Sequence, residues 1–86
     1  MRIDVDSITI ANATRVLASG RAAIEAGDRV IDFTSVVRCD TTAVACVIAW
    51  LRIAGAGAKP LQFIALPHDL RSLARLYGVE ALIGAS

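Results

Sequence analysis

Three consecutive side chains that could carry chemistry, Asp40, Thr41 and Thr42, stand directly before a run of nine residues, Ala43–Leu51, that contains no charge. Polar side chains at this place can cap the free backbone N–H groups at the start of a helix. A hydroxyl held at the positive end of a helix is also well placed to accept a phosphate or to contact an anionic group of a partner. The spacing alone does not decide between capping and contact, so both hypotheses stay open.

The other residues of chemical interest form no familiar catalytic pattern. His68, the single histidine, follows a proline at a predicted helix start, and Cys39 and Cys46 belong to no CxxC or Cys/His ligand spacing. Asp32 and Asp40 flank one loop and resemble a carboxylate pair, but the end of a strand and a helix cap explain them better. We therefore expect a protein without enzymatic activity, cofactor or metal.

The 86-residue chain has nine basic and eight acidic residues, a net charge of +1 and 56% apolar residues. This length suits one domain over residues 1–86. Charges of both signs are spread along the chain without a basic stripe, which argues against a nucleic-acid partner. The longest uncharged apolar run is far shorter than the roughly 18 residues of a membrane span, and the start of the chain does not resemble a signal peptide. We expect a cytoplasmic protein whose surplus apolar surface contacts another protein.

Alternating apolar residues and turn residues predict strands and helices in regular succession. We expect a half-buried strand or short strand pair in residues 2–10, strands at 29–33 and 61–66, helices at 13–26, 41–56 and 67–77, and an extended or helical tail at 79–83. Asn12 is the expected N-cap of the first helix, and a Gly-rich turn at 55–60 is expected to close the second. This order predicts an α/β fold with a small, mostly parallel four-stranded sheet and three to four helices on one face.

The second predicted helix has two apolar stripes. The first follows the spacing of a core-facing helix and contains Val44, Val47, Ile48 and Leu51. The second contains Ala43, Cys46, Trp50 and Ile53. Either the helix is buried on every side, or the second stripe is offered to another protein, and tryptophan is enriched at the energetic centres of such interfaces.

The residues from Val30 to Ile83, VIDFTSVVRCDTTAVACVIAWLRIAGAGAKPLQFIALPHDLRSLARLYGVEALI, resemble a STAS domain. The likeness consists of a strand ending in Asp-Phe, a Val-x-x-x-Asp loop and a hydroxyl pair that opens a long apolar helix. The ending LARLYGVEALI is similar to the STAS subunit of lipid-asymmetry (Mla-type) ABC transporters, often called MlaB-like. The likeness spans about residues 29–83, while residues 1–28 agree only in the order of elements.

This resemblance implies a non-enzymatic subunit that binds the cytoplasmic ATPase of a phospholipid-transporting ABC complex. Such a complex maintains outer-membrane lipid asymmetry in Gram-negative bacteria, and the subunit lies at the inner membrane only through the ATPase. In the related anti-sigma-factor antagonists, a partner kinase phosphorylates the hydroxyl residue that follows the loop aspartate. That residue corresponds to Thr41, so a phosphoswitch regulated at Thr41 is the alternative function.

The expected partner-binding residues combine the start of the second helix with its second apolar stripe. They are Arg38, Asp40, Thr41, Thr42, Cys46, Trp50 and Ile53. We expect Thr41 and Trp50 to lie on one contact surface, with Arg38 and Arg52 as charges at its rim.

Overall fold

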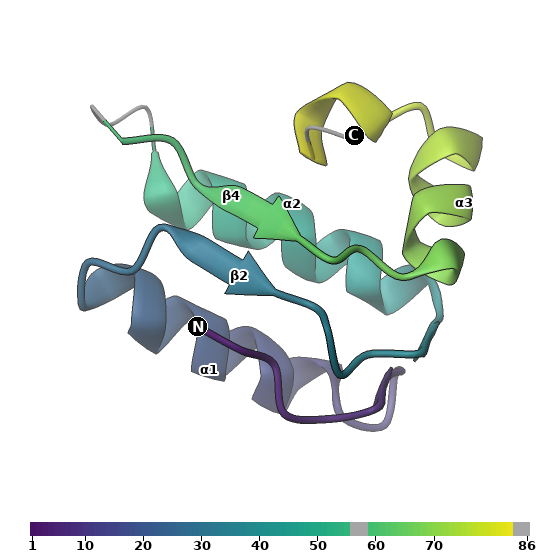
Figure 1. The fold of residues 1–86 in the computed structure, drawn as a ribbon, viewed down its shortest axis with the longest axis horizontal. Coiled ribbons are helices and arrows are strands. Elements are labelled where there is room, and N and C mark those ends of the chain that lie inside the picture. The colour runs from purple at the N-terminus through teal and green to yellow at the C-terminus, as the bar shows by residue number, and fades with distance from the viewer. Residues whose placement is uncertain (56–58, 84–86) are drawn as a thin grey trace.

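The computed structural model describes residues 1–55 and 59–83, in which strands and helices follow the predicted order with one addition, a short strand at residues 38–39 that the sequence did not predict (Figure 1). The elements are β1 (Ser7–Ile8), α1 (Ala13–Glu25), β2 (Val30–Asp32), β3 (Arg38–Cys39), α2 (Thr41–Ala54), β4 (Gln62–Ile64), α3 (His68–Leu76) and the 3₁₀ helix η1 (Glu80–Ile83). The tail, for which the sequence left two possibilities, is therefore helical. Of the turn expected at 55–60, residues 56–58 lie outside the described residues.

The strands pair in parallel, which confirms the predicted strand direction. β1 pairs with β3, with Ser7 opposite Arg38, and β2 pairs with β4, with Val30 opposite Gln62. A further parallel bridge joins Arg2 to Asp32. The described strands thus form two two-stranded sheets instead of the single four-stranded sheet that we expected. The N-terminal segment contributes to both sheets. Arg2 pairs with Asp32 at the end of β2, and Ser7–Ile8 pair with β3. The apolar alternation of the segment breaks at Asp6-Ser7, between these two pairings.

Two helices cover one side of the strands. α1 and α2 lie behind β2 and β4 in Figure 1, and α3 stands beside the carboxyl ends of these two strands. Because side chains alternate along a strand, Ile31 and Phe33 point toward the helices and are fully buried. The buried core consists of Ile3, Ile8, Val16, Ile24, Ile31, Phe33, Val36, Ala43, Val44, Cys46, Val47, Trp50, Leu70, Ala74 and Ile83.

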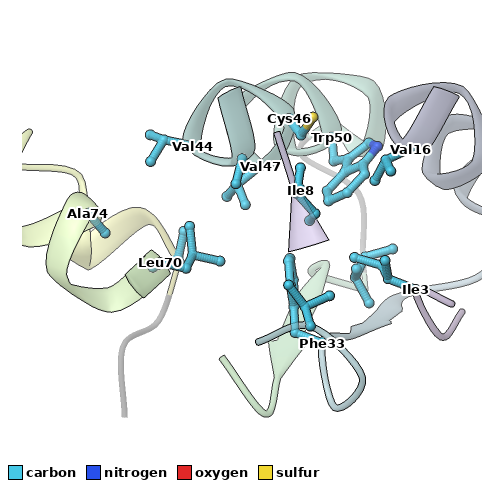
Figure 2. Packing of buried hydrophobic residues seen from close by; sticks show 14 of the residues in the cluster. Ile3, Ile8, Val16, Phe33, Val44, Cys46, Val47, Trp50, Leu70 and Ala74 are labelled. Atoms are coloured by element: carbon cyan, nitrogen blue, oxygen red, sulfur yellow. The ribbon is translucent and has the colours of Figure 1, made fainter. Parts of the chain in front are cut away.

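Trp50 fills the contact between α1 and α2 (Figure 2). Its indole Nε1 donates a hydrogen bond to the carbonyl oxygen of Leu17 at 3.1 Å. The ring lies directly over Gly20, where a Cβ atom would collide with the indole. On its other side the Trp50 ring packs against Phe33, with 6.3 Å between the ring centroids. A glycine on α1 therefore makes room for the largest side chain of the core.

Glycines follow α1 and α3, and a carboxylate caps α2. Gly27, just after α1, and Gly78, just after α3, have positive φ angles of 104° and 69°. Asp40 accepts a hydrogen bond from the backbone N–H of Thr42 at the start of α2. Asn12 does not cap α1 through its side chain. Its amide instead accepts from Thr9 N at 3.0 Å and donates to the carbonyl of Ser7 at 2.8 Å, which closes the turn after β1.

Candidate partner-binding site

Asp40 joins two segments at the end of the molecule where β3 leads into α2. Its Oδ1 accepts hydrogen bonds from Thr42 N at 2.8 Å and from the hydroxyl of Thr42. Its Oδ2 accepts from the backbone N–H of Ile10 at 2.9 Å, in the turn between β1 and α1. One carboxylate therefore caps α2 and holds the neighbouring turn beside it. The hydrogen bonds from the Thr42 side chain and then from its backbone keep the pKa of Asp40 below its ordinary value.

The two threonines at the start of α2 have different surroundings. The Thr42 side chain is half-buried and its hydroxyl is occupied by Asp40, whereas the Thr41 side chain is exposed in the first turn of the helix. Within the described part of the chain, the Thr41 hydroxyl has no hydrogen-bond partner. Capping thus explains Asp40 and Thr42, and Thr41 is the hydroxyl available for contact or modification.

Two exposed apolar side chains accompany Thr41. Ile10 is 83% exposed and Val37 is 67% exposed. Ile10 is held beside the start of α2 by its hydrogen bond to Asp40, and Val37 directly precedes β3, where its N–H donates to Asp6 O at 2.8 Å. Neither residue was predicted from the sequence, because Ile10 continues the apolar alternation of a predicted strand and Val37 lies between predicted elements. Exposed apolar side chains near a free hydroxyl, with Ile10 beside the start of α2 and Val37 just before β3, are typical of a surface that binds protein.

Neither cysteine near this end has the properties of a nucleophile. Burial, followed by the charges of Asp69 and Asp40, raises the pKa of the Cys39 thiol to about 12. Burial also raises the pKa of the Cys46 thiol. Both thiols are therefore protonated at neutral pH, and the thiolate is the reactive form.

The remaining candidates for catalysis do not converge in the structure. The carboxylate of Asp32 accepts hydrogen bonds from the backbone and the hydroxyl of Thr34, next to its own strand. His68 is exposed on α3, with its Nε2 3.4 Å from the hydroxyl of Ser72. In residues 1–55 and 59–83, no three His, Cys, Asp or Glu side chains gather in a way that could hold a metal ion.

Two of the expected partner-binding residues are inside the molecule. Trp50 is 0% exposed and Cys46 is 3% exposed, so the expectation that they face a partner is wrong. Both pack on α1, where the Cys46 thiol lies 3.7 Å from the carbonyl oxygen of Ala13. At about 100° per residue, the nine steps from Thr41 to Trp50 add to about two and a half turns, so the two side chains point to opposite sides of α2. The contact surface that combined Thr41 with Trp50 therefore does not exist.

The structure places the other expected residues on the surface or at its edge. Arg38 and Thr41 are exposed at the start of α2, and Asp40 and Thr42 are half-buried there. Ile53 is half-buried near the end of the same helix. The side of α2 that faces solvent carries Thr41, Ala45 and Arg52, with Ile48 and Ala49 beside them. Ile48, which we expected in the core, is only half-buried.

Short parallel strands that alternate with helices, with an Asp-Thr-Thr start of α2, define a STAS-type α/β domain. The family model described as "Mlab, STAS domain" matches residues 5–84, and the chain belongs to this family. The match includes β1 and α1, so it extends beyond the region of resemblance seen in the sequence. No curated protein in the comparison matches the chain.

Membership of this family indicates a general role for the chain. STAS domains generally act as protein-interaction or regulatory domains and not as enzymes. Among the helices of the described residues, none is both long and apolar enough to cross a membrane.

Proposed function

We propose that this chain is an MlaB-type STAS subunit that binds the cytoplasmic ATPase of a phospholipid-transporting ABC complex. The subunit supports the assembly and activity of that ATPase, and through it lies at the inner membrane and contributes to outer-membrane lipid asymmetry. It acts by binding and catalyses no reaction of its own. The proposal is supported by the family match over residues 5–84 together with the resemblance of the C-terminal motif to transporter subunits.

The observation that carries the binding surface is the exposed group at the start of α2. Thr41, Ile10 and Val37 are exposed, and Asp40 fixes the backbone at the start of α2 and at Ile10 through its bonds to Thr42 and Ile10. Arg38 adds a cation at the rim. Because hydrogen bonds already fix the backbone that carries these exposed side chains, the surface loses little conformational entropy when it binds a protein.

Co-expression of the chain with the ATPase from the same genome tests the partnership. We expect the untagged ATPase to co-purify with the chain, and we expect Thr41→Glu or Ile10→Asp to weaken the complex at least about tenfold, because each places a charge in the contact. A glutamate in the first turn of a helix is compatible with the helix dipole, so Thr41→Glu should fold normally, as circular dichroism can verify.

Ser19→Glu is the matched control, since it adds the same charge at an exposed hydroxyl residue of α1. This variant should bind the ATPase like the original chain. If the original chain does not bind the ATPase, the partnership is wrong. If it binds and neither Thr41→Glu nor Ile10→Asp weakens binding, the partnership stands and the proposed surface is wrong.

A phosphoswitch at Thr41 is the second candidate, and the free, exposed hydroxyl of Thr41 favours it. Phosphate at a helix N-terminus is stabilised by the helix dipole, although the charged Asp40 next to it opposes the added charge. Incubation with the partner kinases of the same cell, followed by mass spectrometry, should locate phosphate on Thr41 and not on Thr42. A chain that stays unmodified at Thr41 would exclude this function.

A further inference from the structure

A groove runs between α1 and α2 on the side of these helices that faces away from the strands. Its volume is about 450 Å³. The floor is apolar and consists of Leu17 from α1 and of Ala45, Ile48, Ala49 and Ile53 from α2. None of these five side chains is fully buried. The core therefore leaves an apolar strip of both helices open to solvent.

Two arginines, Arg21 of α1 and Arg52 of α2, complete the lining of the groove, which contains no acidic residue. The ion pair of Arg21 with Glu25 is weak, because the atoms are 3.9 Å apart and both side chains are more than 60% exposed. Within the described residues, Arg52 takes part in no ion pair. The groove thus combines an apolar floor with two cations that are available to an anionic partner.

The cations are concentrated at one end of the groove. α1 and α2 run in the same direction. Cys46 of α2 contacts the carbonyl of Ala13 of α1. One turn further along both helices, Trp50 contacts the carbonyl of Leu17. One further turn along α1 is Arg21, which therefore lies level with the last turn of α2, where Arg52 lies. The remaining length of the groove is apolar.

This shape and charge fit an α-helix. The floor of α2 extends from Ala45 to Ile53, which is about 12 Å or two helical turns. Ala45 and Ala49 lie one turn apart, and their small side chains allow a helix to approach closely. A lipid bilayer presents a broad surface that cannot enter a groove between two helices. The groove of a second copy of this chain would offer no carboxylate to Arg21 and Arg52, because its lining contains no acidic residue.

We propose that the groove between α1 and α2 binds an amphipathic helix of a partner protein that has acidic residues at one end of its apolar stripe. Helices of this kind bind through apolar side chains at positions i, i+3, i+4 and i+7. The carboxylates of the bound helix pair with Arg21 and Arg52, which sets its direction in the groove. The groove is separate from the group at the start of α2, and this inference does not rest on the ATPase partnership.

Two synthetic peptides of about four helical turns test the proposal. Both carry the same Leu and Ala stripe, one with Glu and the other with Lys at the end of the stripe. Each is titrated into the ¹⁵N-labelled chain and followed by NMR. We expect the Glu peptide to shift the amide signals of Leu17, Ala45, Ala49 and Ile53, and to bind at least about tenfold more tightly than the Lys peptide. The double variant Arg21→Glu/Arg52→Glu should reverse this preference.

Arg15→Glu is the control, because Arg15 lies on α1 outside the groove. It should leave the preference for the Glu peptide unchanged, and dispersed NMR spectra should show that every variant is folded. Equal binding of the two peptides, or amide shifts outside the groove, would overturn the proposal. Tighter binding to phosphatidylglycerol vesicles than to the Glu peptide would also overturn it. The same holds if the chain self-associates in sedimentation experiments and Arg52→Glu strengthens this self-association.

Discussion

Thr41 and Thr42 are adjacent and chemically identical, yet only one of them has a free hydroxyl. Asp40 accepts a hydrogen bond from the Thr42 hydroxyl, and Thr41 points to solvent. The sequence predicted that this cluster would open a helix, which is confirmed. It could not assign the two hydroxyls, because that depends on the direction of each side chain around the helix start and on the second contact of Asp40 with Ile10.

Trp50 shows a different kind of error. The sequence places Trp50 on an apolar stripe, and the frequency of tryptophan at interfaces favours a contact, but the geometry of the helix turns its side chain away from Thr41 and into the core. The angle between Thr41 and Trp50 was available from their spacing alone. The role of Trp50 was not, because it depends on Gly20, thirty residues earlier, which leaves space for the indole.

The fluorescence of Trp50, the single tryptophan of the chain, tests its burial directly. We expect the emission of the folded protein to be blue-shifted relative to the unfolded protein, and acrylamide to quench it weakly, because the ring is shielded from water. Urea should shift the emission to the red in the same transition that circular dichroism reports. Strong quenching in the folded state would show that the ring is exposed, as the sequence analysis expected.

Replacement of Trp50 is consequently a poor probe of partner binding. Trp→Ala in a core typically costs about 3–5 kcal/mol, a large part of the roughly 5–15 kcal/mol that stabilises a small domain. Loss of a complex in Trp50→Ala would report unfolding of the chain. Substitutions at Ile10 and Thr41, which are exposed, avoid this difficulty.

At the scale of elements, the contact between α1 and α2 depends on a glycine inside a helix. Glycine is normally unfavourable there by about 1 kcal/mol relative to alanine. Gly20 is buried on α1 together with Val16 and Ile24. The reason for a residue without a side chain appears only when the second helix is placed against it.

Gly20→Ala should destabilise the fold although it improves helix propensity. The added methyl group collides with the Trp50 ring, and overpacking of this kind costs about 1–3 kcal/mol. We expect a lower urea midpoint for this variant. In combination with Trp50→Phe, which removes the part of the indole nearest Gly20, the additional cost of Gly20→Ala should be smaller.

The adjacent Ser19→Ala is the matched control, because Ser19 is exposed and alanine is the better helix former. Its urea midpoint should stay the same or rise slightly. A Gly20→Ala variant that is as stable as the original chain would contradict the close packing of Trp50 on Gly20.

The strands show how far apolar runs predict a sheet. The sequence predicted a strand at 29–33 and another at 61–66, and the structure has β2 and β4 within these ranges. The observed strands are shorter, because the apolar residues of the core extend past the ends of the strands. Phe33, for example, is fully buried outside β2. Parallel pairing follows from the alternation with helices, whereas the division into two sheets depends on where the N-terminal segment crosses from one partner to the other.

At the scale of the whole molecule, titrating groups predict a stability that falls at both ends of the pH range. The folded chain holds the pKa of Asp28, Asp32 and Asp40 below the ordinary 3.8, through the N-terminal amine for Asp28 and through Thr34 and Thr42 for the other two. Their contribution is present above about pH 4 and is lost as the pH falls through the lowered pKa values. Cys39 acts in the opposite direction. Its pKa rises from 9.0 to about 12, so stability is lost as the pH rises from about 9 toward 12.

Urea midpoints between pH 2 and pH 11 measure how stability depends on pH. Two variants distinguish the loss of stability in acid from the loss in base. Asp40→Asn keeps a good helix cap but no titrating group, so its midpoint should fall less on acidification. The urea midpoint of Cys39→Ala should fall less above pH 9, and in acid it should change like that of the original chain. An acid limb that Asp40→Asn leaves unchanged would show that its hydrogen bonds with Thr42 and Ile10 do not stabilise the charged carboxylate.

The parallel pairing of the strands also has a consequence for how the chain folds. Ser7 pairs with Arg38, and Val30 pairs with Gln62, so each ladder joins residues more than thirty positions apart and encloses a helix. To form such a pairing, the chain must close a long loop, and the entropy lost in closing it is offset only once the long-range contacts form. Domains of this kind therefore fold more slowly than helical bundles. The two ladders also interlock along the chain, because the first closes at residue 38, after the second has begun at residue 30. The β1–β3 ladder lies within the first half of the sequence, but β2, which is enclosed by it, pairs with β4 in the second half. The two halves therefore depend on each other, and the domain should fold and unfold as one cooperative unit.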